Sequence, residues 1–310
     1  MQNHVEKILL VLIIGEFVTG VLGNGFMVLV NCIDWVKSKK LSTVDLILVV
    51  LGISRIGLLC LIKWDSFLFL FFLDQTDDEH QNFIRDLFWI ITHLSSVWFA
   101  TSLSIFYLLK IANFSHPFFL WLKWRINQVV YILLVGPLFV YVSYQSIKLV
   151  ELYSDRTLSR RENERNESQA VQMNRKHYFI EEVGINILNI PPFILSIISC
   201  FLLLYSLWKH SQKMQLKVKT SRDPSTEAHK RAMKAMLSFL ILIIVYHIGI
   251  LFTYKNFSKL TSMFGMALMS LYPTGHSLIL ILWNSKLKHA ALLVWRQLKC
   301  CLKLNKSSNV

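Results

Sequence analysis

The stretch VLGNGFMVLVNCIDWVKSKKLSTVDLILVVLGISRIGLLC (residues 21–60) decides the fold, because it joins two long apolar segments through a short basic loop. Lys37, Lys39 and Lys40 lie in this loop. A helix of about 20 apolar residues can cross a hydrocarbon core of about 30 Å, and lysine-rich loops tend to stay on the cytosolic side. The stretch therefore predicts two membrane spans that are joined in the cytosol.

The same alternation of apolar segments and polar loops continues along the chain. Because a lone lipid-exposed strand cannot satisfy its backbone in the membrane, each apolar segment should be a helix. We predict an all-α membrane protein, a seven-transmembrane-helix bundle that forms one domain over residues 1–310 and ends in a short basic tail at 285–310. The predicted spans are about 8–33, 46–71, 87–109, 127–149, 183–208, 235–254 and 262–283.

Lysine and arginine gather in alternate loops, and this pattern sets the predicted orientation. The loop near 209–234 and the tail are strongly basic, whereas the second loop is acidic and the long fourth loop is nearly balanced. Basic loops mark the cytosolic face, so we predict an external N-terminus, a cytosolic C-terminus and a multi-pass protein of the plasma membrane. This distribution assigns the net charge of +14 to topology and lipid contact rather than to nucleic acid.

Glycosylation and lipidation sites follow from this orientation. Asn166 begins a sequon in the fourth loop, and Asn256 begins a second one that is also predicted to lie outside but close to the membrane. The sequon at Asn113 falls on the cytosolic side, where it cannot be modified. Cys300 and Cys301 follow an amphipathic stretch in the tail, where S-palmitoylation and unmodified thiols are equally good interpretations.

The motifs of enzymes and cofactor-binding proteins are missing from the sequence. It has no glycine-rich phosphate loop, no H-E-x-x-H and no G-x-S-x-G motif, and no cysteine pair has the spacing of metal ligands. We therefore predict no enzymatic activity, no cofactor and no metal site. His93, His247 and His276 lie in different predicted spans and could converge, although a histidine inside a membrane more often serves packing.

Arg55 is the strongest anomaly, because it lies near the middle of the second predicted span. An arginine there costs about 2.5–3.5 kcal/mol on insertion scales, so it should face the bundle interior and be paired. Asn24, inside the first predicted span, is a natural partner. The pair could be a structural clamp, a switch that rearranges on activation, or both.

Several motifs along nearly the whole chain resemble those of bitter taste receptors, the type 2 taste receptor family of G-protein-coupled receptors. A rhodopsin-like receptor would instead carry D-R-Y after its third helix and N-P-x-x-Y in its seventh. The motifs are Leu51-x-x-Ser54-Arg55, FYLLKIANFS at 106–115, Leu203-x-x-Ser206-Leu207 with Lys209-His210, DPSTEAH at 223–229, YPTGHS at 272–277 and NSKLK at 284–288.

The resemblance implies a receptor that binds small bitter-tasting agonists from the outside and activates a gustducin-type heterotrimeric G protein in chemosensory cells. It also implies which residues face the G protein or act as a switch. The basic third cytosolic loop would suit an acidic partner surface. Together with Asn24 and Arg55, the candidate switch named above, the residues predicted to face the G protein or to act as a switch are Tyr107, Lys110, Lys209, His210, His276 and Ser277.

The resemblance also implies an agonist pocket near the outer ends of the helices. Trp89 matches a frequent pocket tryptophan, and His93 stands four residues later where many relatives have asparagine. Met266 stands where some relatives have a carboxylate, which leaves Glu181 and Glu182 as the nearest acids. We therefore predict an aromatic, weakly polar pocket with little commitment to cations. The predicted ligand-binding residues are Trp89, His93, Glu182, Tyr246, His247 and Met266.

Two other functions remain as alternatives. A vomeronasal type 1-like pheromone receptor would share the architecture, but the motifs at 223–226 and at His276 and Ser277 argue against it. A membrane transporter would also bury Arg55, but transporters more often show internal repeats and an even number of spans. The chain shows neither feature.

Overall fold

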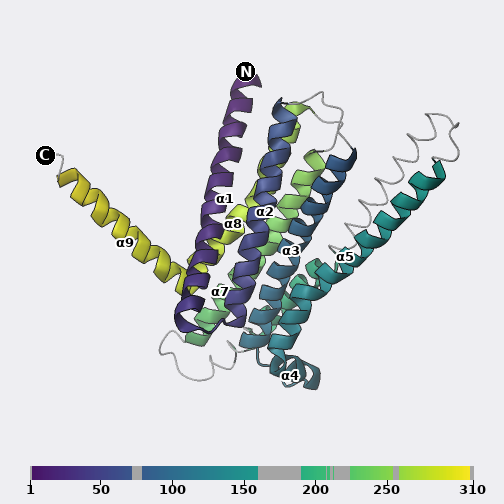
Figure 1. Cartoon of the computed structure of the whole chain (residues 1–310). Helices are drawn as coiled ribbons and strands as arrows, with labels where there is room; N and C mark the ends of the chain where they lie inside the picture. Colours follow the sequence, from purple (N-terminus) through teal and green to yellow (C-terminus); the bar gives the residue numbers. More distant parts are fainter. Residues whose placement is uncertain are drawn as a thin grey trace.

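A computed structural model describes residues 2–71, 79–159, 190–206, 208–209, 212, 224–253 and 258–307. These residues are almost entirely helical, and none of them forms a strand. Figure 1 shows the helices as a bundle of long rods, with α9 leading away from it. The helices are α1 (Gln2–Ser38), α2 (Thr43–Phe71), α3 (Glu79–Ile111), α4 (Pro117–Trp124), α5 (Ile126–Ser159), α7 (Pro224–Phe252), α8 (Lys259–Trp283) and α9 (Ser285–Ser307), with an apolar helix at Ile190–Ser206.

Five helices of the described chain are long and apolar enough to cross a membrane, namely α2, α3, α5, α7 and α8. They overlap the second, third, fourth, sixth and seventh predicted spans. The first predicted span falls inside α1, which has 37 residues and includes Glu6, Lys7 and Glu16. The fifth overlaps the shorter helix Ile190–Ser206, whose neighbours at 181–189 lie outside the described residues.

Helix α8 occupies the centre of the packing, since it contacts α7, α1 and α2. Its closest contact with α7 lies at Gly249 and Gly265. A Cβ atom added to Gly249 would stand 2.8 Å from the carbonyl oxygen of Gly265, and one added to Gly265 would stand 2.6 Å from that of Gly249. Small residues let membrane helices approach closely, so these two glycines bring the α7 and α8 backbones into direct contact.

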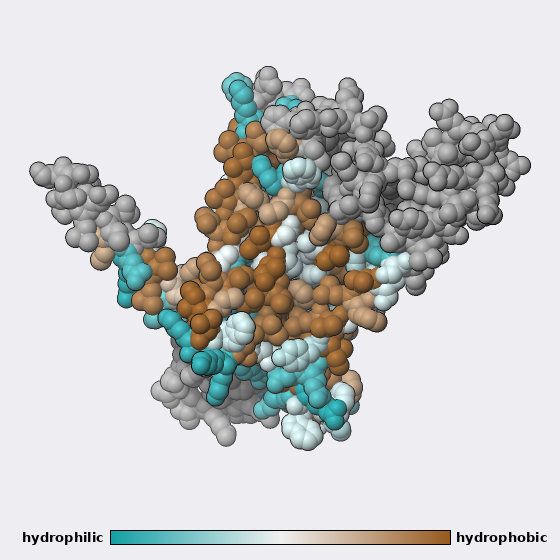
Figure 2. All heavy atoms as spheres, in the orientation of Figure 1, coloured by the Kyte–Doolittle hydropathy of each residue, from teal (hydrophilic) through white to brown (hydrophobic). Residues whose placement is uncertain are grey.

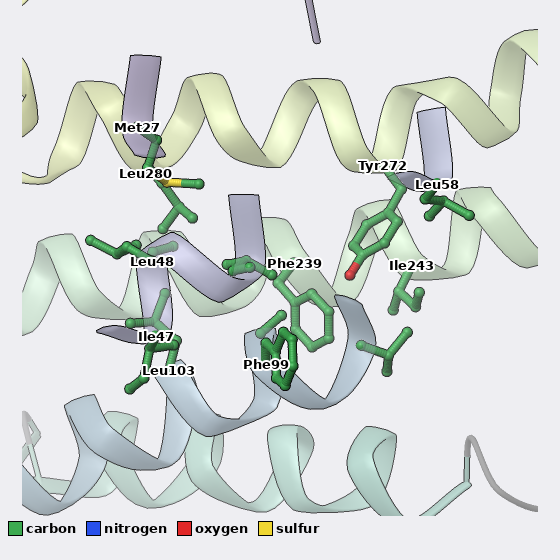
Figure 3. Close-up of a cluster of buried hydrophobic side chains, with 14 of the residues drawn as sticks. Met27, Ile47, Leu48, Leu58, Phe99, Leu103, Phe239, Ile243, Tyr272 and Leu280 are labelled. Carbon is green, nitrogen blue, oxygen red and sulfur yellow. The ribbon is translucent and has the colours of Figure 1, made fainter. Parts of the chain in front are cut away.

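The main hydrophobic core lies where α1, α2, α3, α7 and α8 meet. Figure 3 shows side chains from these helices converging, including Leu58, Phe99, Phe239, Ile243 and Tyr272. Other apolar side chains face outward: Figure 2 shows a broad apolar band across the middle of the visible face, with polar residues gathered mainly along its lower edge. A continuous exposed apolar band is expected of a surface that contacts lipid.

An ionic cluster links the start of α9 to the ends of α1 and α2. The Lys286 ammonium lies 2.7 Å from a carboxylate oxygen of Asp34 and 3.0 Å from one of Asp45. Partial burial alone would lower the pKa of Lys286, but hydrogen bonds and charges from the two aspartates outweigh it, so the pKa is raised. The side chain of Asn284 accepts hydrogen bonds from the backbone N–H groups of Lys286 and Leu287, which caps α9.

Candidate functional site

Arg55 on α2 is fully buried, as predicted, and its guanidinium is held by α8. One nitrogen donates to the Ser277 hydroxyl at 3.2 Å, and another donates to Nδ1 of His276. The guanidinium carbon also lies 5.2 Å from the centroid of the Tyr272 ring, within the range of a cation–π interaction. Three uncharged side chains of α8, those of Tyr272, His276 and Ser277, therefore solvate the buried guanidinium of Arg55.

Asn24 joins this group through Ser277 rather than by a direct bond to Arg55. The Ser277 hydroxyl lies 2.6 Å from Oδ1 of Asn24 and 2.7 Å from the carbonyl oxygen of Pro273, and it can donate to only one of them at a time. The Asn24 amide donates to the carbonyls of Gly20 and Pro273. The expected Asn24–Arg55 contact is thus corrected: among the hydrogen bonds of the described residues, the serine stands between the two.

His276 extends the group to α7. A guanidinium has no acceptor, so Nδ1 of His276 must accept from Arg55, and the ring proton is then on Nε2. The imidazole also hydrogen-bonds to the backbone of Ala235, and its ring centroid lies 5.6 Å from that of Phe239. We call Asn24, Arg55, His276 and Ser277 the polar core. It ties α1, α2, α7 and α8 together near the middle of the bundle.

An aromatic cluster lies next to the polar core and contains three of the predicted ligand residues. The rings of His93 (α3) and Tyr246 (α7) are stacked, with centroids 4.8 Å apart and planes at 13°. His247 contacts His93 edge-on at 6.0 Å. Tyr272 contacts Tyr246 edge-on at 5.7 Å, and its hydroxyl lies 2.9 Å from that of Ser96. Through Tyr272 the aromatic cluster reaches Arg55.

Two polar atoms of this cluster have no hydrogen-bond partner among the residues that the structure describes. They are Nε2 of His93 and the hydroxyl of Tyr246. The side chains are 3% and 0% exposed, respectively. A buried polar group without a partner costs about 1–3 kcal/mol, so such groups in a folded protein call for an explanation. A bound molecule that supplies hydrogen bonds would satisfy both.

The other predicted ligand residues are placed differently. Trp89 is partly buried and packs against the main core, one helical turn before His93. Met266 does not join the cluster among the described contacts, because it packs with Ile13 of α1 and Ala267. Glu181 and Glu182 lie outside the described residues.

The predicted cytosolic residues lie near the opposite ends of the helices. Lys110 is exposed in the last turn of α3, and its ammonium lies 5.3 Å from the centroid of the Phe106 ring. Tyr107 is half-buried beside Phe106, and Lys209 is exposed. His210 lies outside the described residues, as do Asn166 and Asn256. Cys300 is exposed on α9, whereas the side chain of Cys301 is not described.

Two acidic residues inside predicted spans were missed by the sequence reasoning. Glu16 lies on α1 between the buried residues Ile13 and Gly20, and one of its carboxylate oxygens is buried. Asp65 lies on α2, three residues beyond the buried Ile62. The rule that singled out Arg55, namely that a charge inside a membrane demands a reason, would have found both. Among the described residues no group of three metal-ligating side chains occurs.

Comparison with known proteins identifies the family. A family model described as "Taste receptor protein (TAS2R)" matches residues 1–299. The chain belongs to the TAS2R taste receptor family. It is 42% identical over 299 residues to taste receptor type 2 member 7 of Macaca mulatta, covering 95% of this chain and 94% of that protein. It is 47% identical over 305 residues to member 10 of Papio hamadryas, covering 97% of each.

Family membership confirms the predicted class. The chain is a bitter taste receptor of the G-protein-coupled class, with the seven-transmembrane-helix fold of that class, and it is a receptor rather than an enzyme. It is a multi-pass protein of the plasma membrane, and its partners are tastants and a G protein. The aromatic cluster and the polar core therefore lie in the interior of a receptor.

Proposed function

We propose that small bitter agonists bind at the aromatic cluster and that the receptor signals through a gustducin-type heterotrimeric G protein. The observation that supports this most strongly is the pair of buried, unpartnered polar atoms on the stacked rings of His93 and Tyr246. An agonist that reaches them would supply hydrogen bonds that no described residue makes. Trp89 and His247 would add apolar contact to the same molecule.

The route from agonist to G protein would run through Tyr272. This ring contacts Tyr246 on one side and the Arg55 guanidinium on the other. An agonist that shifts Tyr246 therefore changes the surroundings of the polar core, which holds four helices together. Agonist binding would favour the arrangement it binds best. Tyr107, Lys110, Lys209 and His210 would meet the G protein at the cytosolic ends.

A screen of bitter compounds against cells that express the receptor tests this function. Calcium responses should require both the receptor and a gustducin-type subunit, and Trp89→Ala should weaken responses to most agonists. Compounds that act without any G protein would favour a transporter. If Trp89→Ala and His93→Asn both keep normal dose–response curves for several unrelated agonists, the agonist site lies elsewhere in the receptor.

The orientation, the single domain over 1–310 with its tail at 285–310, and the modification sites remain predictions. We expect glycan at Asn166 and none at Asn113, because the two sequons are predicted on opposite sides of the membrane. Glycosidase digestion should sharpen the gel band, and Asn166→Gln should remove most of that shift. A shift that depends on Asn113 would reverse the orientation. Metabolic labelling with a palmitate analogue would decide between lipidated and free Cys300 and Cys301.

A further inference from the structure

We propose that Asp65 makes the agonist site selective for small organic cations, so that the preferred agonists carry a protonated amine. The inference deepens the proposed function and rests on it. It also departs from the expectation drawn from the sequence, which was a weakly polar pocket with little commitment to cations. Three helices contribute to the proposed site: α2 through Asp65, α3 through His93 and α7 through Tyr246.

Asp65 continues the inward face of α2. Leu58 and Ile62 are 0% and 2% exposed, and both belong to the same core as Tyr246. Asp65 follows Ile62 by three residues, so it lies on the same helical face, about one turn further outward. One of its carboxylate oxygens has no accessible surface. Its charge is close enough to interact electrostatically with the Tyr246 phenol.

Two polar atoms on the stacked rings of His93 and Tyr246 are suited to an ammonium group. A phenol oxygen accepts hydrogen bonds, and so does Nε2 of His93 when the imidazole proton is on Nδ1. Both atoms lack a hydrogen-bond partner among the described residues. A carboxylate adds the negative charge, and hydrogen bonds between charged groups are about twice as strong as neutral ones. Two unpartnered acceptors on stacked rings, one of which interacts with the Asp65 carboxylate, match the N–H donors of a protonated amine.

The positive charge of Arg55, on the inner side of the Tyr246–Tyr272 pair, limits where a cation can bind. The Arg55 guanidinium lies against Tyr272, whose ring contacts Tyr246. A second cation would be repelled from that side and attracted toward Asp65, so it should bind on the outer side of the tyrosine pair. Asp65 also makes an interaction of its own within the receptor, which an incoming ammonium would share or replace.

The experiment compares matched probes that differ in charge. One pair is 2-phenylethylammonium and 2-phenylethanol, and a second is cyclohexylmethylammonium and cyclohexylmethanol. Dose–response curves are recorded with the full-length receptor, its G protein and a measured surface level. Asp65→Asn removes the charge with little change of shape. Glu16→Gln is the matched control, since it neutralises a carboxylate on α1 that lies outside the proposed site.

We expect Asp65→Asn to raise the half-maximal concentration of the ammonium probes about tenfold or more, as for loss of a charged hydrogen bond. The neutral probes should change less than about twofold, and Glu16→Gln should not separate the two classes. Equal shifts for both classes, or activation by the neutral probes alone, would overturn the cation proposal. So would silence of all four probes if the bitter panel still evokes Trp89-dependent responses. Silence to the whole panel instead contradicts the proposed function.

A second measurement needs no variant and therefore holds even if Asp65→Asn fails to reach the surface. N-Benzylmorpholine, whose conjugate acid titrates near neutral pH, is applied to the wild-type receptor at several pH values. Its potency should follow the protonated fraction and fall as the pH rises, whereas 2-phenylethylammonium, protonated throughout, corrects for effects of pH on the receptor. Potency that rises with the neutral fraction would contradict selection of cations.

Discussion

The polar core and the aromatic cluster lie side by side, share Tyr272 and yet handle buried polarity in opposite ways. In the polar core, Arg55, His276, Ser277 and Asn24 are joined by hydrogen bonds, although Nε of Arg55 has no partner among the described residues. In the aromatic cluster, His93 and Tyr246 bury polar atoms that no described residue satisfies. The difference separates two uses of polar groups in a membrane: a satisfied group holds helices together, and an unsatisfied group can bind an incoming molecule.

Removing Arg55 should have the largest effect, because it breaks the satisfied group. Arg55→Ala leaves Ser277 and His276 without their donor, and an unpaired buried group costs about 1–3 kcal/mol. We expect a large loss of surface expression and of signalling, measured by surface labelling and calcium response. The control is Lys63→Ala, which changes a basic residue of α2 about two turns further outward that is only partly buried. Equal, mild effects of the two changes would contradict a buried polar clamp.

Changing His93 should alter ligand recognition rather than folding. His93→Asn keeps a polar side chain but loses the stacked ring, so potency or rank order among agonists should change by roughly tenfold, as for about 1.4 kcal/mol. Surface expression should stay near the wild-type level. Loss of surface expression in this variant would instead give His93 a structural role like that of the polar core. The aromatic cluster and the polar core would then not differ in function.

Ser277 tests whether the polar core acts as one unit. Ser277→Ala removes the link between Arg55 and Asn24 but leaves the bond to His276. We expect the free energy of unfolding to fall by about 1 kcal/mol, which would lower the melting temperature of the purified receptor and alter its basal signal. In the double variant with Asn24→Ala, the two losses should not add, because both remove the same hydrogen bond. Fully additive losses would mean that Asn24 and Arg55 act independently.

The ion pairs of Lys286 with Asp34 and Asp45 also join helices, but they are partly exposed to water. Removing them should therefore have the smallest effect on stability. Exposed ion pairs contribute about 0–1 kcal/mol, so Lys286→Gln should lower the melting temperature slightly. Because the pKa of Lys286 is raised in the folded state, its contribution is complete at pH values below the ordinary lysine pKa and is lost only above it. The difference between variant and wild type should therefore be constant from pH 6 to 8. A difference that varies across this range would point to another titrating group.

The sequence predicted burial of Arg55 because a charge near the middle of an apolar span is costly in lipid however the helices pack. It did not predict the Ser277 bridge, because the hydroxyl comes between Arg55 and Asn24 only through the way that α1, α2 and α8 pack. Family resemblance named His93 and Tyr246, but not their stacking. Met266 packs with Ile13 rather than with the aromatic cluster, since its direction depends on the rotation of α8, which no motif specifies.

The contact between Gly249 and Gly265 has a mechanical consequence. Because the backbones of α7 and α8 are in contact at Gly249 and Gly265, the two helices cannot approach more closely there, and no side chain fits between them. This contact is therefore a point about which α7 can tilt. The distance along α7 from Gly249 to Ala232, 17 residues away, is about 26 Å at 1.5 Å per residue. A tilt of α7 by about 10° around the glycine contact would move the Ala232 end of the helix by about 4–5 Å. The rings of Tyr246 and His247, which lie near Gly249, would hardly move.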